Sequence, residues 1–310
     1  MFKKTLIAAA VATMASSVAM ADVKIGGKVE QQQQKSEAGE WSGWSDVRLT
    51  VSGDEDLGNG MSAFFMFQDE MGLRTGAGAQ QYDQLVGLKS SAGTLIMGKV
   101  EDFTESKVMS MTDKTMGAGG VEIGANLGRN EGAIAYVSPA FNGLTVGVAG
   151  YALSAGGGSE DAFDAVDLGL MYSNGPLSVN VSFENDKRAA TAATAATAAF
   201  DSGDSTSIGA SYAAGDLTVA ATQQMTSYDT AGKADEDDTS IAVTYNMGNN
   251  KVVVGWNDNE TSAGATVTDT NSNVIELQHS FSKTTAAYVQ FYNTDVAAGD
   301  TTSFGLQHSF

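Results

Sequence analysis

The chain has 310 residues, of which 37 are Asp or Glu and 17 are Lys or Arg, so its formal charge at pH 7 is −20. This acidic balance argues against nucleic acid as a partner, because phosphate binding draws on clustered Lys and Arg. The chain has no cysteine, which excludes disulfides, zinc thiolate sites and cysteine nucleophiles. After residue 21, no stretch reaches the roughly 20 apolar residues of a membrane-spanning helix, which leaves a soluble protein and an outer-membrane barrel as candidates.

Residues 1–21 are expected to be a cleaved secretory signal. Lys3 and Lys4 precede the apolar run TLIAAAVATM, and small residues lead up to AMA at 19–21, which is the usual layout of such a signal. The folded part of the chain is therefore expected to be a single domain of residues 22–310. Because the signal contains two lysines and no acidic residue, the exported chain has a charge of about −22.

Most of the remaining sequence alternates between apolar and polar residues with a period of two, as in PLSVNVSFE and TSIAVTYN. This pattern indicates β-strands. Runs rich in Val, Ile, Thr, Phe and Tyr, and bounded by Gly, Asn, Asp or Ser, predict sixteen strands at 22–33, 44–53, 60–69, 81–89, 93–100, 131–138, 142–152, 165–173, 175–185, 205–214, 216–226, 238–247, 250–258, 272–281, 284–294 and 301–310.

The connections between these strands alternate between short and long. Seven short ones, such as SSAG at 90–93 and SNGP at 173–176, mostly contain the Gly, Asn or Asp of tight turns. Eight longer polar connections lie between them, and the longest is 101–130. This alternation predicts an up-and-down antiparallel meander with short turns at one rim and long loops at the other. A β-sandwich with crossovers gives no reason for short and long connections to alternate.

The direction in which the apolar face points is not fixed by alternation alone. In 175–185, apolar residues at 177, 179, 181 and 183 alternate with polar residues, and a water-soluble sandwich shows the same pattern. Two features favour a membrane barrel: the strands are about ten residues long, enough to cross the hydrocarbon layer at a tilt, and a barrel of about 16 strands has a lumen too wide for side chains to fill. The predicted fold is therefore all-β, a 16-stranded antiparallel transmembrane β-barrel.

Both histidines of the chain lie in a repeated pentapeptide, LQHSF, at 277–281 and 306–310. Each copy ends a predicted strand at the rim with the short turns, so each places an aromatic residue at the same edge of the membrane, where amphipathic rings form a belt. We interpret His279 and His308 as part of that girdle rather than as metal ligands or catalytic groups, because neither has a plausible partner in the sequence.

Several stretches resemble one family of proteins. RNEGAIAYVSPAFNGLTVGV at 129–148 resembles the R…N…Y-x-SP-x-F-x-GL signature of the Gram-negative general porins, and VRLTVSGDEDLGNGMSAFFMF at 47–67 resembles their second and third strands with the intervening turn. LVGLKSSAGTLIMGKV at 85–100, SFSKTTAAYVQFY at 280–292 and GLQHSF at 305–310 are similar to further family patterns. The strand that ends on Phe310 resembles the assembly signal of bacterial outer-membrane barrels. The similarity extends along the whole chain.

This resemblance implies a homotrimer in the outer membrane, inserted among its lipids by the barrel assembly machinery. It also implies that the third long loop folds into the lumen and forms a constriction in which acidic loop residues face basic residues of the wall. The matching positions are Arg48, Lys99 and Arg129 on the wall and Glu101, Asp102, Glu105, Asp113 and Glu122 on the loop. The chain departs from the family where Lys99 replaces the usual Arg and where SKTT replaces SKRT, and these changes alter the width and field of a constriction.

The predicted function is passive diffusion of small hydrophilic solutes and ions, with a preference for cations because five loop acids face three wall bases. Alternatives are a non-conducting adhesin or structural barrel, and a substrate-selective porin. An enzyme is not expected, since no nucleophile and base stand out. No cofactor is expected either, although the acidic run ADEDD at 234–238 offers oxygen ligands for Ca²⁺ or Mg²⁺. We interpret this run mainly as solvated loop charge.

Overall fold

The computed structural model describes residues 22–72, 80–124, 127–152, 162–187, 202–229, 233–263 and 266–310, so the predicted signal at 1–21 lies outside the described residues. Within them the chain forms sixteen strands, which are β1 (Lys24–Ser36), β2 (Trp41–Gly58), β3 (Met61–Gly72), β4 (Gln80–Ser90), β5 (Gly93–Glu101), β6 (Arg129–Val137), β7 (Leu144–Tyr151), β8 (Ala165–Asn174), β9 (Leu177–Asp186), β10 (Gly203–Ala214), β11 (Leu217–Tyr228), β12 (Asp235–Met247), β13 (Asn250–Ala263), β14 (Thr266–Ser280), β15 (Thr285–Thr294) and β16 (Thr301–Ser309).

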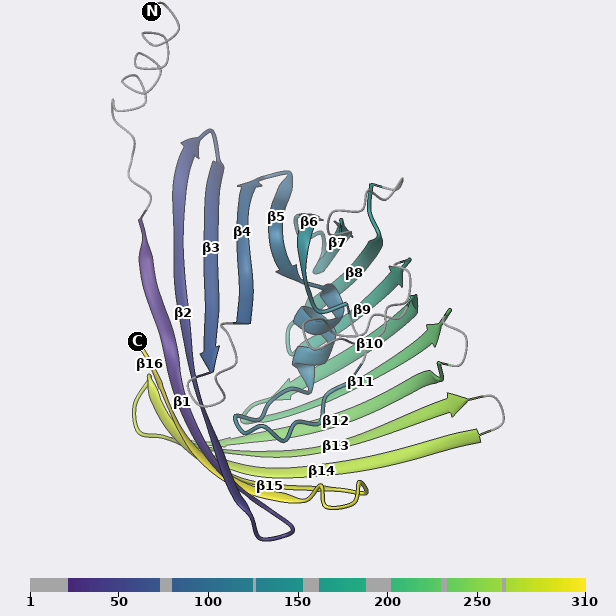
Figure 1. Cartoon of the computed structure of the whole chain (residues 1–310). Helices are drawn as coiled ribbons and strands as arrows, with labels where there is room; N and C mark the ends of the chain where they lie inside the picture. The colour runs from purple at the N-terminus through teal and green to yellow at the C-terminus, as the bar shows by residue number, and fades with distance from the viewer. Residues whose placement is uncertain are drawn as a thin grey trace, which may run out of the picture.

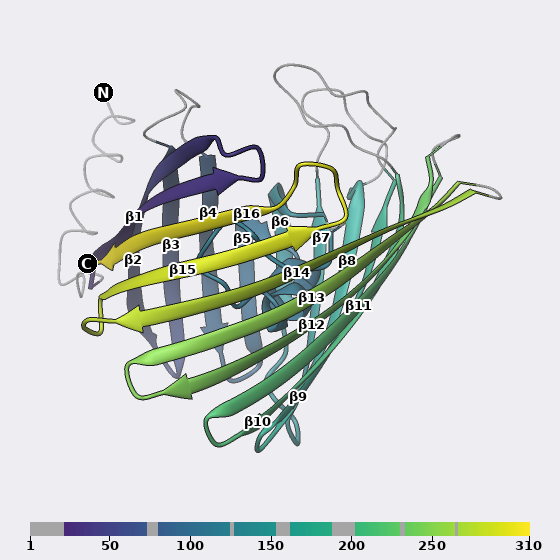
Figure 2. The same ribbon diagram turned by 90° about the horizontal axis from the view of Figure 1, so that it is seen from below.

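The strands form one closed barrel in which each strand pairs with its neighbours in the sequence and β16 pairs with β1. All of these pairs are antiparallel, and closure places Val29 of β1 opposite His308 of β16. Figure 1 and Figure 2 show the strands following one another around the wall in chain order. The predicted fold class is confirmed. Because the sheet closes on itself, no strand edge is left to pair with another chain.

The two faces of the wall have opposite character. Large apolar side chains at alternate positions are exposed on the outside, as Val148, Phe183 and Ile208 are. Between them, polar side chains such as Glu184 and Gln224 are buried on the inside. This is the reverse of a water-soluble sandwich, in which the apolar face would be buried. The outer face thus suits contact with lipid, and the inner face suits contact with water and polar side chains.

Several strands are longer than predicted. β13 ends at Ala263 and β14 begins at Thr266, so most of the connection predicted at 259–271 is a paired hairpin. The acidic run is also part of a strand, since Asp235 to Asp238 belong to β12 and pair with β13. That run was expected to be a loop. Polar residues on both faces hide such an extension from a pattern search, because a strand beyond the hydrocarbon layer needs no apolar side.

The turn after β2 shows the same error, because β2 is also longer than predicted. The predicted turn DEDLGNG covered 54–60, but β2 continues to Gly58 and only Asn59 and Gly60 connect it to β3. Both residues have positive φ, 54° and 74°. A two-residue turn of this kind requires positive φ at both central residues, which Asn and Gly adopt most easily. The acidic residues before it continue the β2–β3 ladder.

His279 and His308 lie on the outward faces of β14 and β16 together with exposed Leu277 and Leu306. The His279 ring packs edge-on against Phe281 with 4.8 Å between ring centroids, and His308 Nδ1 lies 2.9 Å from the Thr285 hydroxyl. Their positions agree with the predicted aromatic edge rather than with a site in the lumen.

Residues 102–128 connect β5 to β6 and include two short helices, η1 (Thr104–Val108), a single π-helical turn, and η2 (Met109–Met111), a 3₁₀ turn. Figure 1 shows the coiled ribbon of this segment beside β9 and β10. We call residues 102–128 the third connection. In the described part of the chain, no helix is long and apolar enough to cross a membrane.

Candidate functional site

The third connection is fastened to the wall by an apolar contact at its start. Phe103 belongs to a cluster of buried side chains contributed by β5 to β8, among them Ala149 and Tyr151. The Phe103 ring lies directly against Gly147 of β7 and Gly169 of β8, where a Cβ would collide with it. Gly147 belongs to the VGVAG run, and the absence of a side chain there allows the ring to pack on the backbone.

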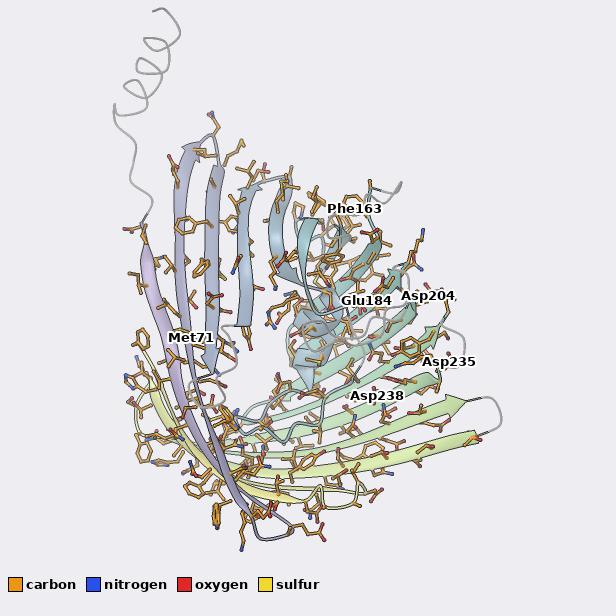
Figure 3. The ribbon with its side chains drawn as sticks, in the orientation of Figure 1. Met71, Phe163, Glu184, Asp204, Asp235 and Asp238 are labelled. Carbon is orange, nitrogen blue, oxygen red and sulfur yellow. The ribbon has the colours of Figure 1, made fainter. Side chains whose placement is uncertain are left out.

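Further along, the third connection meets strands on other parts of the wall. The Thr104 hydroxyl lies 2.6 Å from the Ser182 hydroxyl on β9, and the Thr112 hydroxyl lies 3.1 Å from that of Thr222 on β11. Gly124 donates its backbone N–H to the Asp238 carboxylate on β12 at 2.9 Å. Asp238 is one of the six residues labelled in Figure 3.

The middle of the third connection is held by hydrogen bonds to inward-facing side chains of β14, β15 and β1. The backbone N–H groups of Met116 and Gly117 donate to the two carboxylate oxygens of Glu276 at 2.8 and 2.9 Å. Gly119 donates to Gln290 at 3.0 Å, and Gln290 returns a hydrogen bond to the Gly119 carbonyl at 2.9 Å. A backbone segment away from regular structure must find such partners when it is shielded from water.

Two predicted basic residues of the wall come together around one aromatic ring. Arg48 on β2 and Arg129 on β6 place their guanidinium carbons 3.9 and 4.2 Å from the centroid of the Tyr82 ring. Arg48 also binds Glu70 through Nε at 2.8 Å and Nη2 at 2.5 Å. The ring stacks with planar cations and separates two like charges that would otherwise repel one another.

Arg129 in turn joins the wall to the third connection. Its Nη1 donates to Glu105 at 2.9 Å, its Nη2 pairs with Glu101, and its Nε lies 3.5 Å from Asp83. We call Arg48, Glu70, Tyr82, Asp83, Glu101, Glu105 and Arg129 the charged cluster. It contains two guanidinium groups and four carboxylates.

Two carboxylates of the third connection have pKa values near neutrality. Loss of hydration raises the pKa of Glu105 to about 7, because this cost and the nearby charge of Glu101 outweigh the attraction of Arg129. Glu122 keeps exposed surface, yet the surrounding protein and then the charge of Asp113 raise its pKa to about 7. Both groups therefore change charge near neutral pH.

Asp113 and Lys114 follow η2, and burial shifts their pKa values in opposite directions. Burial raises the pKa of Asp113, with Lys114 acting against the shift. Burial also lowers the pKa of Lys114, with Asp113 acting against it. Lys114 Nζ donates to the Ser110 carbonyl at 2.5 Å. Lys114 and Lys107 border a cavity of about 580 Å³ between the third connection and β7 to β11. Neither lysine was among the predicted site residues.

Four of the eight predicted residues lie outside the charged cluster, namely Asp113 and Glu122, described above, and Lys99 and Asp102. Lys99 has Glu131 as its nearest carboxylate, at 3.8 Å. Asp102 is fully buried, so it does not line a water-filled passage as expected. It accepts hydrogen bonds from the backbone N–H groups of Glu105, at 2.6 Å, and of Gly128. Burial and the charge of Glu184 raise the pKa of Asp102 well above its usual range.

Sequence patterns missed the partners that complete the site. Tyr82 and Asp83 lie in a strand with ordinary alternation, and Glu276 and Gln290 lie 159 or more residues from their contacts in the third connection. One signal in the sequence could have pointed to these partners. A carboxylate at an inward-facing position of an otherwise apolar strand indicates that the carboxylate has a specific buried partner.

A closed sixteen-stranded barrel with an apolar outside, a polar inside and charged groups around one connection is the architecture of an outer-membrane channel. The chain belongs to the Gram-negative porin family, whose model matches residues 8–299. Family and fold indicate an outer-membrane location, and they point to a channel rather than an enzyme.

The chain is 29% identical over 161 residues to an outer membrane porin of Bordetella pertussis, a match that covers 44% of this chain and 41% of that protein. Less than half of that relative is therefore matched. Solved structures share the fold along nearly the whole chain. OmpF of Salmonella typhi, in complex with daunomycin, has a TM-score of 0.76 at 13% identity and covers 93% of this chain and 97% of its own.

An anion-selective porin from Comamonas acidovorans has a TM-score of 0.73 at 21% identity, covering 94% of this chain and 100% of its own. OmpT of Vibrio cholerae, in a form lacking loop L8, has a TM-score of 0.74 at 18% identity, covering 94% of this chain and 99% of its own. At these identities the similarity shows the fold alone, so conduction properties must be argued from the residues of this chain.

Proposed function

We propose that the protein is a passive diffusion channel for small hydrophilic solutes and ions across the outer membrane, and that it prefers cations. The observation that carries the proposal is the inverted pattern of the closed barrel, with exposed apolar side chains outside and polar side chains inside. A barrel of this strand number encloses an aqueous lumen, and no lipid-facing polar edge remains to be hidden.

The third connection is proposed to fold into the lumen and set its narrowest section. This is supported by hydrogen bonds from its backbone to inward-facing side chains of the wall, among them Glu276 on β14 and Asp238 on β12. It is also supported by the packing of Phe103 on Gly147. A passage between this connection and the wall at Arg48 and Arg129 would have charged groups on both sides.

Cation preference follows from the balance of those groups. The charged cluster has two fixed positive charges and four carboxylates, and Asp113 and Glu122 add acids on the third connection. Lys99, Lys107 and Lys114 oppose them, so these groups are six acids against five bases, and the excess is negative once Glu105 and Glu122 are ionised above pH 7. The anion-selective porin from Comamonas acidovorans has the same fold, so the fold does not by itself impose a preference for cations, and the proposal rests on the side chains of this chain.

A homotrimer is proposed as the assembly. OmpT of Vibrio cholerae was solved in a trimer form and has a TM-score of 0.72 with this chain at 16% identity. Exposed apolar residues on the outer face of the barrel can contact either lipid or a neighbouring subunit. Single-channel conductance steps that appear in threes, together with a trimer mass in detergent, are the expected result, and a monomer that conducts in single steps would contradict the trimer alone.

Diffusion is tested by swelling of liposomes that contain the purified protein. Uncharged sugars of increasing size should enter at rates that fall steeply with size and without saturation. Rates that saturate with one sugar would favour the substrate-selective alternative, and liposomes that take up no sugar would favour the non-conducting barrel. Heat-modifiable migration on a gel confirms in each case that the barrel is folded.

A further inference from the structure

Three carboxylates meet where the third connection leaves the wall. Asp102, Asp167 of β8 and Glu184 of β9 each place an oxygen within 4.8 Å of the other two. The side chains are 0%, 1% and 6% exposed, respectively. Figure 3 shows Glu184 on β9 beside the coil of the third connection. We call these residues the buried acidic triad.

The register of the sheet forces two of these groups together. Asp167 and Glu184 are direct cross-strand partners on β8 and β9, and like charges in that position destabilise a sheet. Among the described residues, no Lys or Arg forms an ion pair with any member of the triad. Three ionised carboxylates shielded from water are costly, so the charge must be compensated by bound protons or by a bound cation.

Unused polar atoms at the same place point to a bound ligand. Asp167 Oδ1 and Glu184 Oε1 are buried and have no hydrogen-bond partner, and the same holds for the hydroxyl of Tyr151. Tyr151 is 0% exposed and pairs across the sheet with Ala165, two residues from Asp167 on the same face. Its hydroxyl is in electrostatic range of all three carboxylates. Buried polar atoms are rarely left unpaired in folded proteins.

We propose that the buried acidic triad binds one divalent metal ion, with Ca²⁺ as the preferred ion. The donors are all oxygens, which hard cations favour. Ca²⁺ suits the site better than Mg²⁺, because it accepts irregular coordination and loses its water more readily, and the triad is shielded from the solvent that Mg²⁺ keeps as ligands. The Tyr151 hydroxyl offers a further neutral oxygen.

The site would fasten both ends of the third connection. Asp102 already accepts the N–H groups of Glu105 and Gly128, near the two ends of this segment, and Asp167 accepts the N–H of Phe103 at 2.5 Å. An ion shared by Asp102, Asp167 and Glu184 links those ends to β8 and β9. This inference concerns the anchor of the connection and stands whether or not the channel prefers cations.

The test uses the full barrel, purified in detergent, stripped with EDTA and freed of the chelator. Calorimetric titration with CaCl₂ should show one saturable site per chain, and TbCl₃ should give tyrosine-sensitised emission that Ca²⁺ displaces. Asp167→Asn and Glu184→Gln keep the shape of each side chain while removing one ligand charge, so each should weaken the Ca²⁺ affinity by about tenfold or more.

A matched control removes acids elsewhere. Asp235→Asn with Asp237→Asn neutralises half of the acidic run on β12 and should leave the Ca²⁺ affinity unchanged. Retained heat-modifiable migration shows that each variant is folded, and Glu184→Gln decides the question where Asp167→Asn does not fold. A wild-type barrel that binds no Ca²⁺, or binding that is lost in the β12 variant and kept in both triad variants, overturns the proposal.

Discussion

The charge on Glu122 should control part of the ion selectivity, and Glu122→Gln removes it. With a pKa of about 7, the carboxyl group is about one-tenth ionised at pH 6 and about nine-tenths ionised at pH 8. Raising the pH therefore adds negative charge to the third connection. Because an acid loses its proton and becomes negative as the pH rises, the preference for cations should rise with pH and not fall.

The size of the effect follows from Coulomb's law. A unit charge acts on an ion roughly 7 Å away in water with about 0.6 kcal/mol, and screening at 0.1 M salt reduces this to about 0.3 kcal/mol. The charge attracts a cation and repels an anion by similar amounts. The cation-to-anion permeability ratio should therefore rise by roughly twofold to fivefold between pH 6 and pH 8 as Glu122 ionises.

The assay is the reversal potential of single channels in a planar bilayer under a fixed salt gradient, recorded from pH 5.5 to 8.5. Glu122→Gln should flatten most of the rise, and Glu105→Gln in addition should remove the remainder, since the pKa of Glu105 is also about 7. Glu40→Gln, in the exposed turn after β1, is the matched control and should keep the wild-type curve. A Glu122→Gln channel with the full pH dependence of the wild type would refute the reasoning.

Three further predictions follow from the packing. Phe103→Ala removes a buried ring that lies on Gly147 and should cost about 3–5 kcal/mol of local stability. Single-channel conductance should become larger and noisier while the barrel stays folded. An unchanged current trace would contradict the role of Phe103 in fastening the third connection. Ile208→Lys places a charge on the outward face of β10, where Ile208 is 45% exposed, and should lower barrel stability by about 2–4 kcal/mol in urea unfolding, whereas inward Ser211→Lys should cost little. Phe310→Ala loses a ring that packs against Gly27 and should reduce the heat-modifiable band in outer-membrane fractions; full assembly of this variant would count against the terminal signal.

The strands could be predicted because the sequence features that mark a strand lie within the strand and its turns. Each strand segment shows apolar and polar residues alternating with a period of two, and hairpin turns such as Asn59 and Gly60 consist of residues that tolerate positive φ. The ends of β12 to β14 could not be predicted in the same way. Beyond the membrane both faces of a strand are polar, and the residues of an extended hairpin then look like those of a loop.

The site was predicted in part. Arg48 and Arg129 meet on the ring of Tyr82, and Arg129 pairs with Glu101 and Glu105, so the structure brings four of the predicted residues together. Asp102 was assigned to the same group by its neighbours in sequence, yet the start of η1 turns it toward β8 and β9. Asp102 accepts hydrogen bonds from Glu105 and Gly128, but the carboxylates beside it, Asp167 and Glu184, are more than 60 positions away, and no local pattern reports them.

The most direct test of the account is the reversal potential of the wild-type channel at pH 7.5 with KCl at different concentrations on the two sides of a planar bilayer. The excess of carboxylates in the charged cluster and the third connection predicts that the dilute side becomes positive at zero current, since K⁺ crosses more easily than Cl⁻. A dilute side that becomes negative would show that chloride is preferred and would contradict the central claim.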